Sequence, residues 1–230
     1  PALADAVARR AAHEPLAYLL GEWGFYRESY LLSPDCLIPR EDTELLAETA
    51  IASLPRGARF ADLCTGCGCV GLSVLAHTDA TRALLLDISE GAVHMAKRNA
   101  ARLGLEDRAE FLVADVCEGL GDGKFDAILS NPPYVKNAVY PTLSEEVRRE
   151  PLRAFLGGED GMDFYRVILA KYKSRLTEGG FFAFEIGFDE EEEYDGTPNE
   201  AFRIPSPDIV DDNIYQPGYT FRLPLKSYRI

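Results

Sequence analysis

The feature that most constrains the fold is a regular alternation of apolar runs and helical stretches, which begins near residue 58. Apolar runs typical of strands buried on both faces of a parallel sheet lie at residues 59–64, 83–87, 110–114, 125–130 and 181–186. Stretches of helical periodicity lie between them at residues 70–77, 90–103 and 163–176. Ser89 and Gly104 are expected to begin and end the helix 90–103. The alternation predicts a doubly wound, mostly parallel α/β sheet whose ligand crevice lies at the carboxyl ends of the strands.

The two ends of the chain differ from this central pattern. Residues 2–12 are predicted to form a helix, the aromatic run that ends at Tyr30 a hairpin, and residues 43–54 an amphipathic helix. An acidic run occupies residues 189–193, and two short strands are expected near the C-terminus at residues 215–216 and 219–223. We therefore expect three parts. These are an N-terminal unit (residues 1–54), the α/β domain (residues 55–188) and an atypical acidic segment that ends in closing strands of the sheet (residues 189–230).

The composition narrows the classes of partner and compartment. The chain has a formal net charge of −14, whereas proteins that grip duplex nucleic acid usually present a basic face. No stretch approaches the roughly 20 apolar residues that span a bilayer, and we find no basic-then-apolar leader. We therefore expect a cytoplasmic protein that binds neither a membrane nor duplex nucleic acid.

The cysteines are expected to be free thiols. The chain has five, an odd number that argues against a disulfide framework. Three of them, Cys64, Cys67 and Cys69, are interleaved with glycines, and no nearby histidine completes the four ligands of a tetrahedral metal site. We therefore expect small buried side chains at these positions and no metal.

A glycine-rich loop follows the first predicted strand and opens a helix. Gly66 and Gly68 permit backbone angles with positive φ and allow a ligand to approach the main chain closely. Together with Gly71 they form a Gly-x-Gly-x-x-Gly pattern, which several nucleotide-containing cofactors use, so the pattern alone does not identify the cofactor. Asp87 ends the next strand, where a carboxylate can accept both hydroxyl groups of a ribose. NAD and S-adenosylmethionine both fit these features.

Neighbouring side chains favour S-adenosylmethionine over NAD. An NAD site places a pyrophosphate on the helix N-terminus, whereas S-adenosylmethionine brings an amino acid whose ammonium group needs acceptors. Asp62, just before the glycine loop, can receive that ammonium directly or through water. Asp115 and Val116 follow the third predicted strand, where an acid can bind the exocyclic amine of adenine. Solvation of a strand end is the alternative role for Asp62 and Asp115.

A second loop lies directly after the fourth predicted strand and contains Asn131, Pro132, Pro133 and Tyr134. Pro132 forces Asn131 into an extended conformation, and neither proline has a backbone N–H to donate. The acceptors left facing the crevice are the Asn131 side-chain oxygen and the Pro132 carbonyl. Because a planar –NH2 group offers two N–H donors, these acceptors can hold an amide or an aromatic amine.

Holding both hydrogens of such a group prepares it for methylation. Its conjugated lone pair is a weak nucleophile, but two hydrogen bonds align the nitrogen with a sulfonium methyl and stabilise the charge that develops on it. Tyr134 is expected to offer a flat face for packing. Fixing both reactants can contribute on the order of 7–11 kcal/mol. The sequence therefore predicts an S-adenosylmethionine-dependent methyltransferase in which Asn131, Pro132 and Tyr134 are catalytic and S-adenosylhomocysteine is the product.

Beyond these two loops, five blocks of sequence resemble the release-factor glutamine methyltransferase family. They lie at residues 14–21, 38–44, 150–154, 157–161 and 185–187. The resemblance implies a Rossmann-like class I methyltransferase with a seven-stranded sheet. It also implies that residues 1–54 are the remnant of a helical substrate-docking domain, and it ends at residue 187, where the acidic segment departs from the family's pattern.

The resemblance further implies a substrate and its binding residues. The substrate would be the glutamine of the Gly-Gly-Gln loop of a peptide-chain release factor, methylated on its side-chain amide nitrogen N5, which links the protein to translation termination. The same resemblance assigns binding of the methyl donor to Cys64, Thr65, Gly66, Cys67, Gly68, Asp87 and Asn131. It assigns the glutamine amide to residues 131–134, and Val116 stands where some members have Trp beside the adenine.

Three other functions are alternatives. The first is methylation of N6 of adenine in a nucleic acid, or of a glutamine in a ribosomal protein. An adenine in a duplex must be flipped out and its surroundings gripped, and we find no basic stripe that would do so. The second is an NAD-dependent oxidoreductase, although nothing after the fourth predicted strand supplies hydride chemistry. The third is a non-catalytic binding module that keeps the fold.

Overall fold

The structure, a computed structural model, describes residues 2–80, 82–121, 123–187 and 219–224. Six strands within these residues form one sheet in the order β5-β4-β3-β6-β7-β8. The first five are parallel to one another, and β8 is antiparallel to β7. They are β3 (Arg59–Leu63), β4 (Arg82–Asp87), β5 (Ala109–Val113), β6 (Phe125–Ser130), β7 (Leu176–Ile186) and β8 (Tyr219–Pro224). The predicted doubly wound α/β sheet is thereby confirmed.

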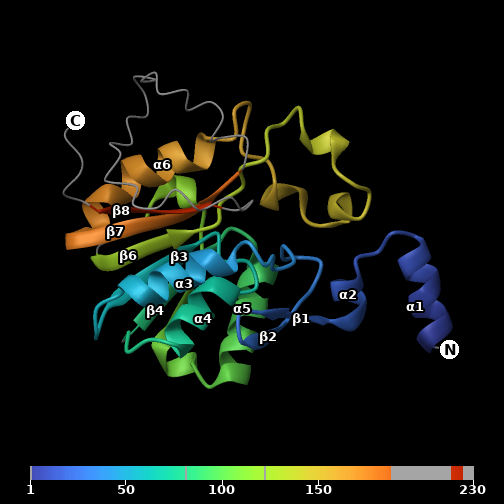
Figure 1. Cartoon of the computed structure of the whole chain (residues 1–230), viewed down its shortest axis with the longest axis horizontal. Helices are drawn as coiled ribbons and strands as arrows, with labels where there is room; N and C mark the ends of the chain where they lie inside the picture. The colour runs from blue at the N-terminus through green and yellow to red at the C-terminus, as the bar shows by residue number, and fades with distance from the viewer. Residues whose placement is uncertain (1, 81, 122, 188–218, 225–230) are drawn as a thin grey trace, which may run out of the picture.

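Helices cover both faces of the sheet. Figure 1 shows α3 (Glu44–Ser53), α4 (Cys69–Ala76) and α5 (Glu90–Leu103) on one side of the sheet and α6 (Asp163–Tyr172) on the other. Alternate side chains of β7 enter the two layers, because successive residues of a strand point to opposite faces. Phe181 and Ala183 pack in the cluster of α3, α4 and α5, whereas Phe182 and Phe184 pack in the cluster of α6. Burial on both faces explains why these strands are continuously apolar.

The predicted element boundaries hold except around residue 176. Ser89 caps α5, since its Oγ accepts a hydrogen bond from the Ala92 amide, and Gly104 ends it in the left-handed conformation with φ 68°. The predicted helix 163–176, however, ends at Tyr172, and β7 begins at Leu176 instead of residue 181. Gly179, with φ 80°, lies inside the strand next to Gly180. These two glycines therefore mark an irregularity within β7 and not its beginning.

The number of strands is only partly tested. A seven-stranded sheet was predicted, and six strands of this sheet lie within the described residues. The first of the two short strands expected near the C-terminus, residues 215–216, lies outside the described residues, as does the acidic run 189–193. The second corresponds to β8, which pairs along β7 from Ile186↔Tyr219 to Phe181↔Pro224.

The segment before the sheet forms a hairpin, as predicted, and a helix that was not predicted. The hairpin consists of β1 (Glu22–Phe25) and β2 (Glu28–Leu31), and the additional helix is α2 (Leu16–Leu20). The buried Tyr30 hydroxyl of β2 shares a hydrogen bond with Ser73 Oγ at 2.6 Å, and a second buried side chain, Asn99 of α5, also ties the hairpin to the sheet domain. Its Oδ1 accepts from the Leu31 amide at 2.7 Å, and its Nδ2 donates to the Leu31 carbonyl at 3.0 Å and to the Cys67 carbonyl at 2.9 Å.

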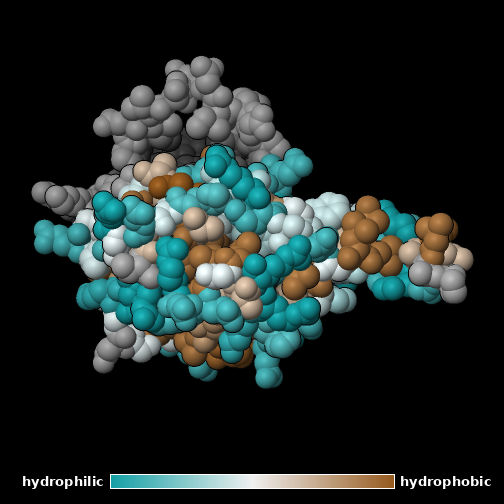
Figure 2. Space-filling view, turned by 90° about the horizontal axis from the view of Figure 1, so that it is seen from below, coloured by the Kyte–Doolittle hydropathy of each residue, from teal (hydrophilic) through white to brown (hydrophobic). Residues whose placement is uncertain are grey.

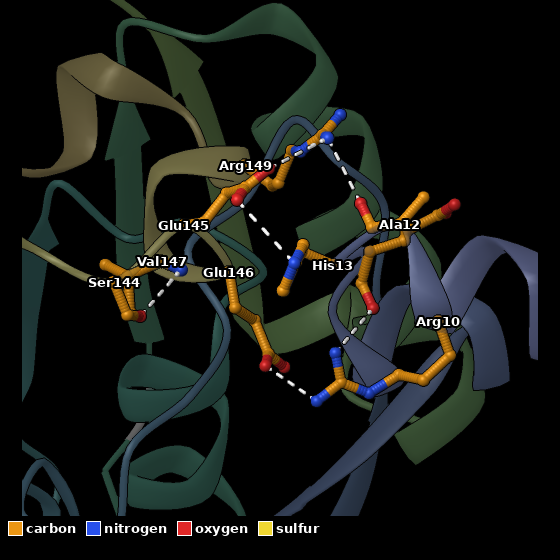
Figure 3. Close-up of polar contacts among 9 residues, drawn as sticks. Arg10, Ala12, His13, Ser144, Glu145, Glu146, Val147 and Arg149 are labelled. Atoms are coloured by element: carbon orange, nitrogen blue, oxygen red, sulfur yellow. Dashed lines mark hydrogen bonds and ion pairs between the residues drawn. The ribbon is translucent and has the colours of Figure 1, made fainter.

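The first helix, α1 (Ala2–Ala11), projects from the rest of the molecule (Figure 1). Polar contacts tie its C-terminal end to residues 144–149 (Figure 3): Arg10 Nη2 lies 2.7 Å from Glu146 Oε2, and Arg149 Nη2 donates to the Ala12 carbonyl at 3.1 Å. Figure 2 shows apolar residues gathered on this projecting part, among them Leu3, which is 78% exposed. In the described part of the chain, no helix combines the length and the apolar character needed to cross a membrane.

Replacement of Asn99 by alanine is expected to lower the free energy of unfolding by about 2–4 kcal/mol, because it leaves buried backbone groups of Leu31 and Cys67 without partners. Urea denaturation followed by circular dichroism measures the change. The matched control is Asn137→Ala, whose side chain is exposed. Equal stability of the two variants would contradict the anchoring role of Asn99.

Candidate active site

The glycine loop turns sharply between β3 and α4. Gly66 and Gly68 have φ values of 56° and 86°, and Cys64 also lies in the left-handed region with φ 59°. Gly71 is required for a different reason, because a Cβ there would lie 2.8 Å from Oδ2 of Asp62. The loop therefore depends on glycine for backbone conformation at two positions and for close packing at a third.

Asp62 is buried at the end of β3, with 2% of its surface exposed. Its Oδ2 accepts hydrogen bonds from Thr65 Oγ1 at 2.5 Å and from the Gly71 amide at 2.9 Å. Burial raises its pKa to about 7, although both hydrogen bonds act in the opposite direction. A carboxyl group held this way gains its charge most readily when a cation approaches.

Asp87 ends the neighbouring strand β4 and orders the loops on either side of it. Its Oδ2 accepts from the Gly66 amide at 2.9 Å, and its Oδ1 accepts from the Ser89 amide at 2.8 Å. Burial raises the pKa of this carboxyl group, and these backbone hydrogen bonds oppose the shift. Each oxygen keeps lone pairs for further donors.

Two adjoining cavities lie at the carboxyl ends of the strands. The smaller has a volume of about 40 Å³ and the larger about 500 Å³. Both are lined by Leu37, Cys64, Gly66 and Asn131, so the glycine loop and the loop after β6 form their common wall. This is the place at which the strand order of a doubly wound sheet reverses, where such folds bind ligands.

Most of the predicted site residues line one of these cavities. The smaller cavity is lined by Asp62, Cys64, Thr65, Gly66, Cys67 and Asn131. The larger is lined by Cys64, Gly66, Asp87, Asp115, Val116, Asn131 and Pro133. Three predicted residues, Gly68, Pro132 and Tyr134, line neither cavity.

Asp115 and Val116 both line the larger cavity. Oδ1 of Asp115 accepts from the Cys117 amide at 2.7 Å and caps a short 3₁₀ turn, Val116–Glu118. Val116 is buried, and the ring of Phe164 lies on the same cavity wall. The lining of the larger cavity therefore combines an acidic acceptor with apolar side chains, a combination suited to a flat heteroaromatic ring.

The loop after β6 places Asn131 at the cavities and directs the Tyr134 side chain elsewhere. Asn131 lines both cavities, and its Nδ2 donates to Thr43 Oγ1 at 3.2 Å. Tyr134 was expected to offer a face to the acceptor group, but its hydroxyl donates to Glu185 Oε1 at 3.2 Å, and its ring lines neither cavity. Pro132 is buried.

Several residues of the site were not identified as site residues from the sequence. Thr43 lines the smaller cavity, and Arg153 and Phe164 line the larger. Glu150 is buried and accepts from the Ile38 amide at 2.9 Å and from the Arg40 guanidinium group, which joins two parts of the chain across the site. For three of these residues the family resemblance was a signal in the sequence, since Thr43, Glu150 and Arg153 lie in two of the blocks that carry it.

The cysteines line the cavity as thiols. All five are free in the structure. Burial raises the pKa of the Cys64 thiol, so this group is uncharged near neutral pH. Within the described ranges, no three His, Cys, Asp or Glu side chains are grouped closely enough to hold a metal ion.

The fold and the cavities define a Rossmann-like methyltransferase domain, and comparisons with known proteins support this class. Residues 41–149 match the family described as "Methyltransferase small domain". Among solved structures, a ribosomal protein L11 methylase from Lactobacillus delbrueckii subsp. bulgaricus is similar, with a TM-score of 0.50 and 20% identity. The alignment covers 70% of this chain and 69% of that chain, and at this identity it supports the fold alone.

Curated relatives identify the family. A release factor glutamine methyltransferase from Rhodospirillum rubrum is 45% identical over 188 residues, which cover 81% of this chain and 58% of that protein. A second, from Clostridium acetobutylicum, is 37% identical over 205 residues, which cover 86% of this chain and 72% of that protein. The chain belongs to the release factor glutamine methyltransferase family, and it spans a little over half the length of the Rhodospirillum relative.

The raised pKa of Asp62 predicts a pH dependence of stability. Its pKa rises on folding from an ordinary 3.8 to about 7, so the folded chain holds a proton that the unfolded chain has lost in this interval. The free energy of unfolding contributed by this group should therefore fall as the pH rises from about 4 to about 7. Asp62→Asn is expected to make the fall smaller, as measured by urea denaturation across this interval. Asp107→Asn, an exposed control, should leave it unchanged, and identical profiles in all three proteins would exclude Asp62 as a cause.

Proposed function

We propose that this chain transfers a methyl group from S-adenosylmethionine to the side-chain amide nitrogen of a glutamine in a peptide-chain release factor. The two relatives indicate the substrate class, since both are named release factor glutamine methyltransferases. The glutamine of the Gly-Gly-Gln loop is the acceptor that the family resemblance implies. A release factor as partner places the reaction in the cytoplasm.

The two cavities fit the two ends of the methyl donor. S-adenosylmethionine supplies a methyl group on a positively charged sulfur. Asp62, in the smaller cavity, is placed to bind the ammonium group of the amino acid part, and Asp87, in the larger cavity, to accept the ribose hydroxyl groups. Asp115 and Phe164 form the surfaces for the adenine. Burial makes each contact stronger than it would be in water.

The observation that carries the proposal is the position and orientation of the Asn131 amide. Its side chain lies on the common wall of the two cavities, and its Nδ2 is occupied by Thr43 Oγ1. Its Oδ1 is thus the atom available to accept an N–H from a ligand. An acceptor at this point suits a neutral amide, which must be held by its hydrogens.

The remaining steps of the reaction need no strong base. An amide nitrogen that has gained a methyl group is acidic enough to lose its proton to water. The contribution of the chain is to orient the amide and to stabilise positive charge on its nitrogen with the Asn131 oxygen. Preorganised polar groups of this kind act without reorganisation during the reaction.

Incubation of the chain with S-adenosylmethionine and a release factor is expected to add one methyl group to a single glutamine, detected by mass spectrometry of proteolytic peptides. A duplex DNA and a ribosomal protein serve as alternative substrates in parallel reactions. Transfer to either at a rate equal to that on the release factor would contradict the proposal.

Asn131→Ala removes the acceptor and leaves an amide hydrogen of the substrate unpaired. The single-turnover rate should fall by roughly 10²- to 10³-fold, while donor affinity, measured by calorimetry, stays close to that of the unaltered chain. Asn131→Asp should lose turnover as well. Its negative charge attracts the positively charged sulfur of the bound donor, and this attraction is lost as methyl transfer neutralises the sulfur. Asn137→Ala, on an exposed part of the following segment, is the control. Near-normal turnover of Asn131→Ala would rule out this mechanism.

Asp87→Asn tests the donor site separately from the chemistry. An amide retains one oxygen acceptor but cannot accept from both ribose hydroxyl groups as a carboxylate can. Donor affinity should therefore weaken by roughly 1.5–3 kcal/mol, as for the loss of a hydrogen bond to a charged group. Titration calorimetry with S-adenosylmethionine measures the change, with Asp107→Asn as the exposed control. Unchanged affinity would remove Asp87 from the site.

A further inference from the structure

One buried carboxyl group beside the site has no role in the mechanism above. Glu185, near the carboxyl end of β7, is 3% exposed and lines neither cavity. Its Oε1 accepts a hydrogen bond from the Tyr134 hydroxyl. Its Oε2 is the one buried side-chain polar atom in the described part of the chain that makes no hydrogen bond of good geometry. Because an unpaired buried carboxylate oxygen is costly, its position needs a physical reason.

Two side chains of the site, Thr43 and Asn131, interact with this carboxyl group. Thr43, just before α3, is 3% exposed, and its Oγ1 accepts from Asn131 Nδ2 at 3.2 Å. Burial raises the pKa of Glu185, and the nearby Thr43 hydroxyl and Asn131 amide act to lower it. Three segments far apart in the sequence therefore meet here: the start of α3, the loop after β6 and the end of β7.

The donor and acceptor capacities of these groups allow one direction of hydrogen bonding. A hydroxyl group has a single hydrogen, and a carboxylate can only accept. If Asn131 Nδ2 donates to Thr43, the Thr43 hydrogen is free to turn toward Glu185, whose Oε2 has no other partner. The reversed amide would place the Asn131 oxygen against Thr43 and would draw the Thr43 hydrogen away from the carboxylate.

We propose that Glu185 and Thr43 are positioning residues that hold the Asn131 amide with its oxygen toward the cavities, where it accepts an N–H of the substrate. Glu185 holds the Thr43 hydroxyl, also interacts with the Asn131 amide itself, and does not touch the reacting atoms. Hydrogen bonds in a chain also polarise one another, so the carboxylate increases the negative charge on Asn131 Oδ1. The consequence for methyl transfer rests on the proposed function, whereas the orientation of the amide does not.

The test uses the 230-residue chain with four single variants and one double variant. Thr43→Val removes the hydroxyl group at nearly constant volume, and Thr43→Ser retains it. Glu185→Gln keeps the shape but introduces a donor. Thr177→Val is the matched control, because Thr177 Oγ1 donates to Asp126 Oδ1 at 2.9 Å, a hydroxyl–carboxylate pair at the opposite end of the same strand. Single-turnover methylation of a release factor and donor affinity are measured for each.

Thr43→Val is expected to reduce the single-turnover rate about 10- to 100-fold, with donor affinity within about twofold of the unaltered chain. Thr43→Ser should restore the rate, and Thr177→Val should retain it while losing some stability. Glu185→Gln should also reduce the rate. The double variant Thr43→Val with Glu185→Gln should lose less than the two single losses combined, because both residues act on the same Asn131 amide. Additive losses would overturn the proposed connection.

A second measurement tests the orientation without any activity. The side-chain ¹⁵N–¹H signals of Asn131 are assigned by their absence in Asn131→Ala. In Thr43→Val, the signal of the Asn131 amide proton that was hydrogen-bonded to Thr43 Oγ1 should shift upfield, and this proton should exchange faster with water. In the control Thr177→Val, both Asn131 side-chain signals should stay unchanged. A release factor left unmethylated by the unaltered chain would contradict the proposed function but not this inference. Unchanged Asn131 signals, or an unchanged rate in a chain that does methylate, would overturn the inference.

Discussion

The pairing of β3 with β6 at the centre of the sheet is the interaction on which the site depends. Their carboxyl ends are in register, with Leu63 opposite Ser130, and Ser130 Oγ donates to the Leu63 carbonyl at 2.7 Å. The chain leaves these two strands toward opposite faces, into α4 and toward α6, so a crevice opens between them. The glycine loop and Asn131 become neighbours because the strands before them are neighbours.

Buried or partly buried acids at the ends of three strands give this crevice its chemical character. These acids are Asp62 in β3, Asp87 in β4 and Glu185 in β7. Burial raises the pKa of all three carboxyl groups. Backbone amides of the glycine loop and of α5 offset part of that cost at Asp62 and Asp87. The first two acids face the cavities, where a cationic, ribose-bearing ligand would complete their interactions, whereas Glu185 faces the loop that would hold the acceptor.

The segment before α3 completes the site from outside the sheet. Its backbone at Ile38 and its side chain at Arg40 are both bound by Glu150, and Tyr18 donates to the Cys36 carbonyl at 2.5 Å. These contacts hold residues 37–40 along the smaller cavity and bring Thr43 to Asn131. The hairpin is joined to the same region through Asn99, whose Nδ2 also binds the Cys67 carbonyl of the glycine loop. Both early segments therefore brace the loops of the site.

Local pattern was sufficient for the strands, most helices, the caps of α5 and those site residues that lie at the end of a strand, such as Asp62, Asp87 and Asn131. Parallel strands present their carboxyl ends at one edge, so the sequence by itself determined that these residues would gather there. It did not determine α2, the early start of β7, the direction of the Tyr134 hydroxyl, or the roles of Thr43 and Glu185. Thr43 meets Asn131 across 88 residues of chain. Such a contact depends on how α3 docks against the sheet, and no periodicity within either segment encodes that distance, so only the tertiary structure decided it.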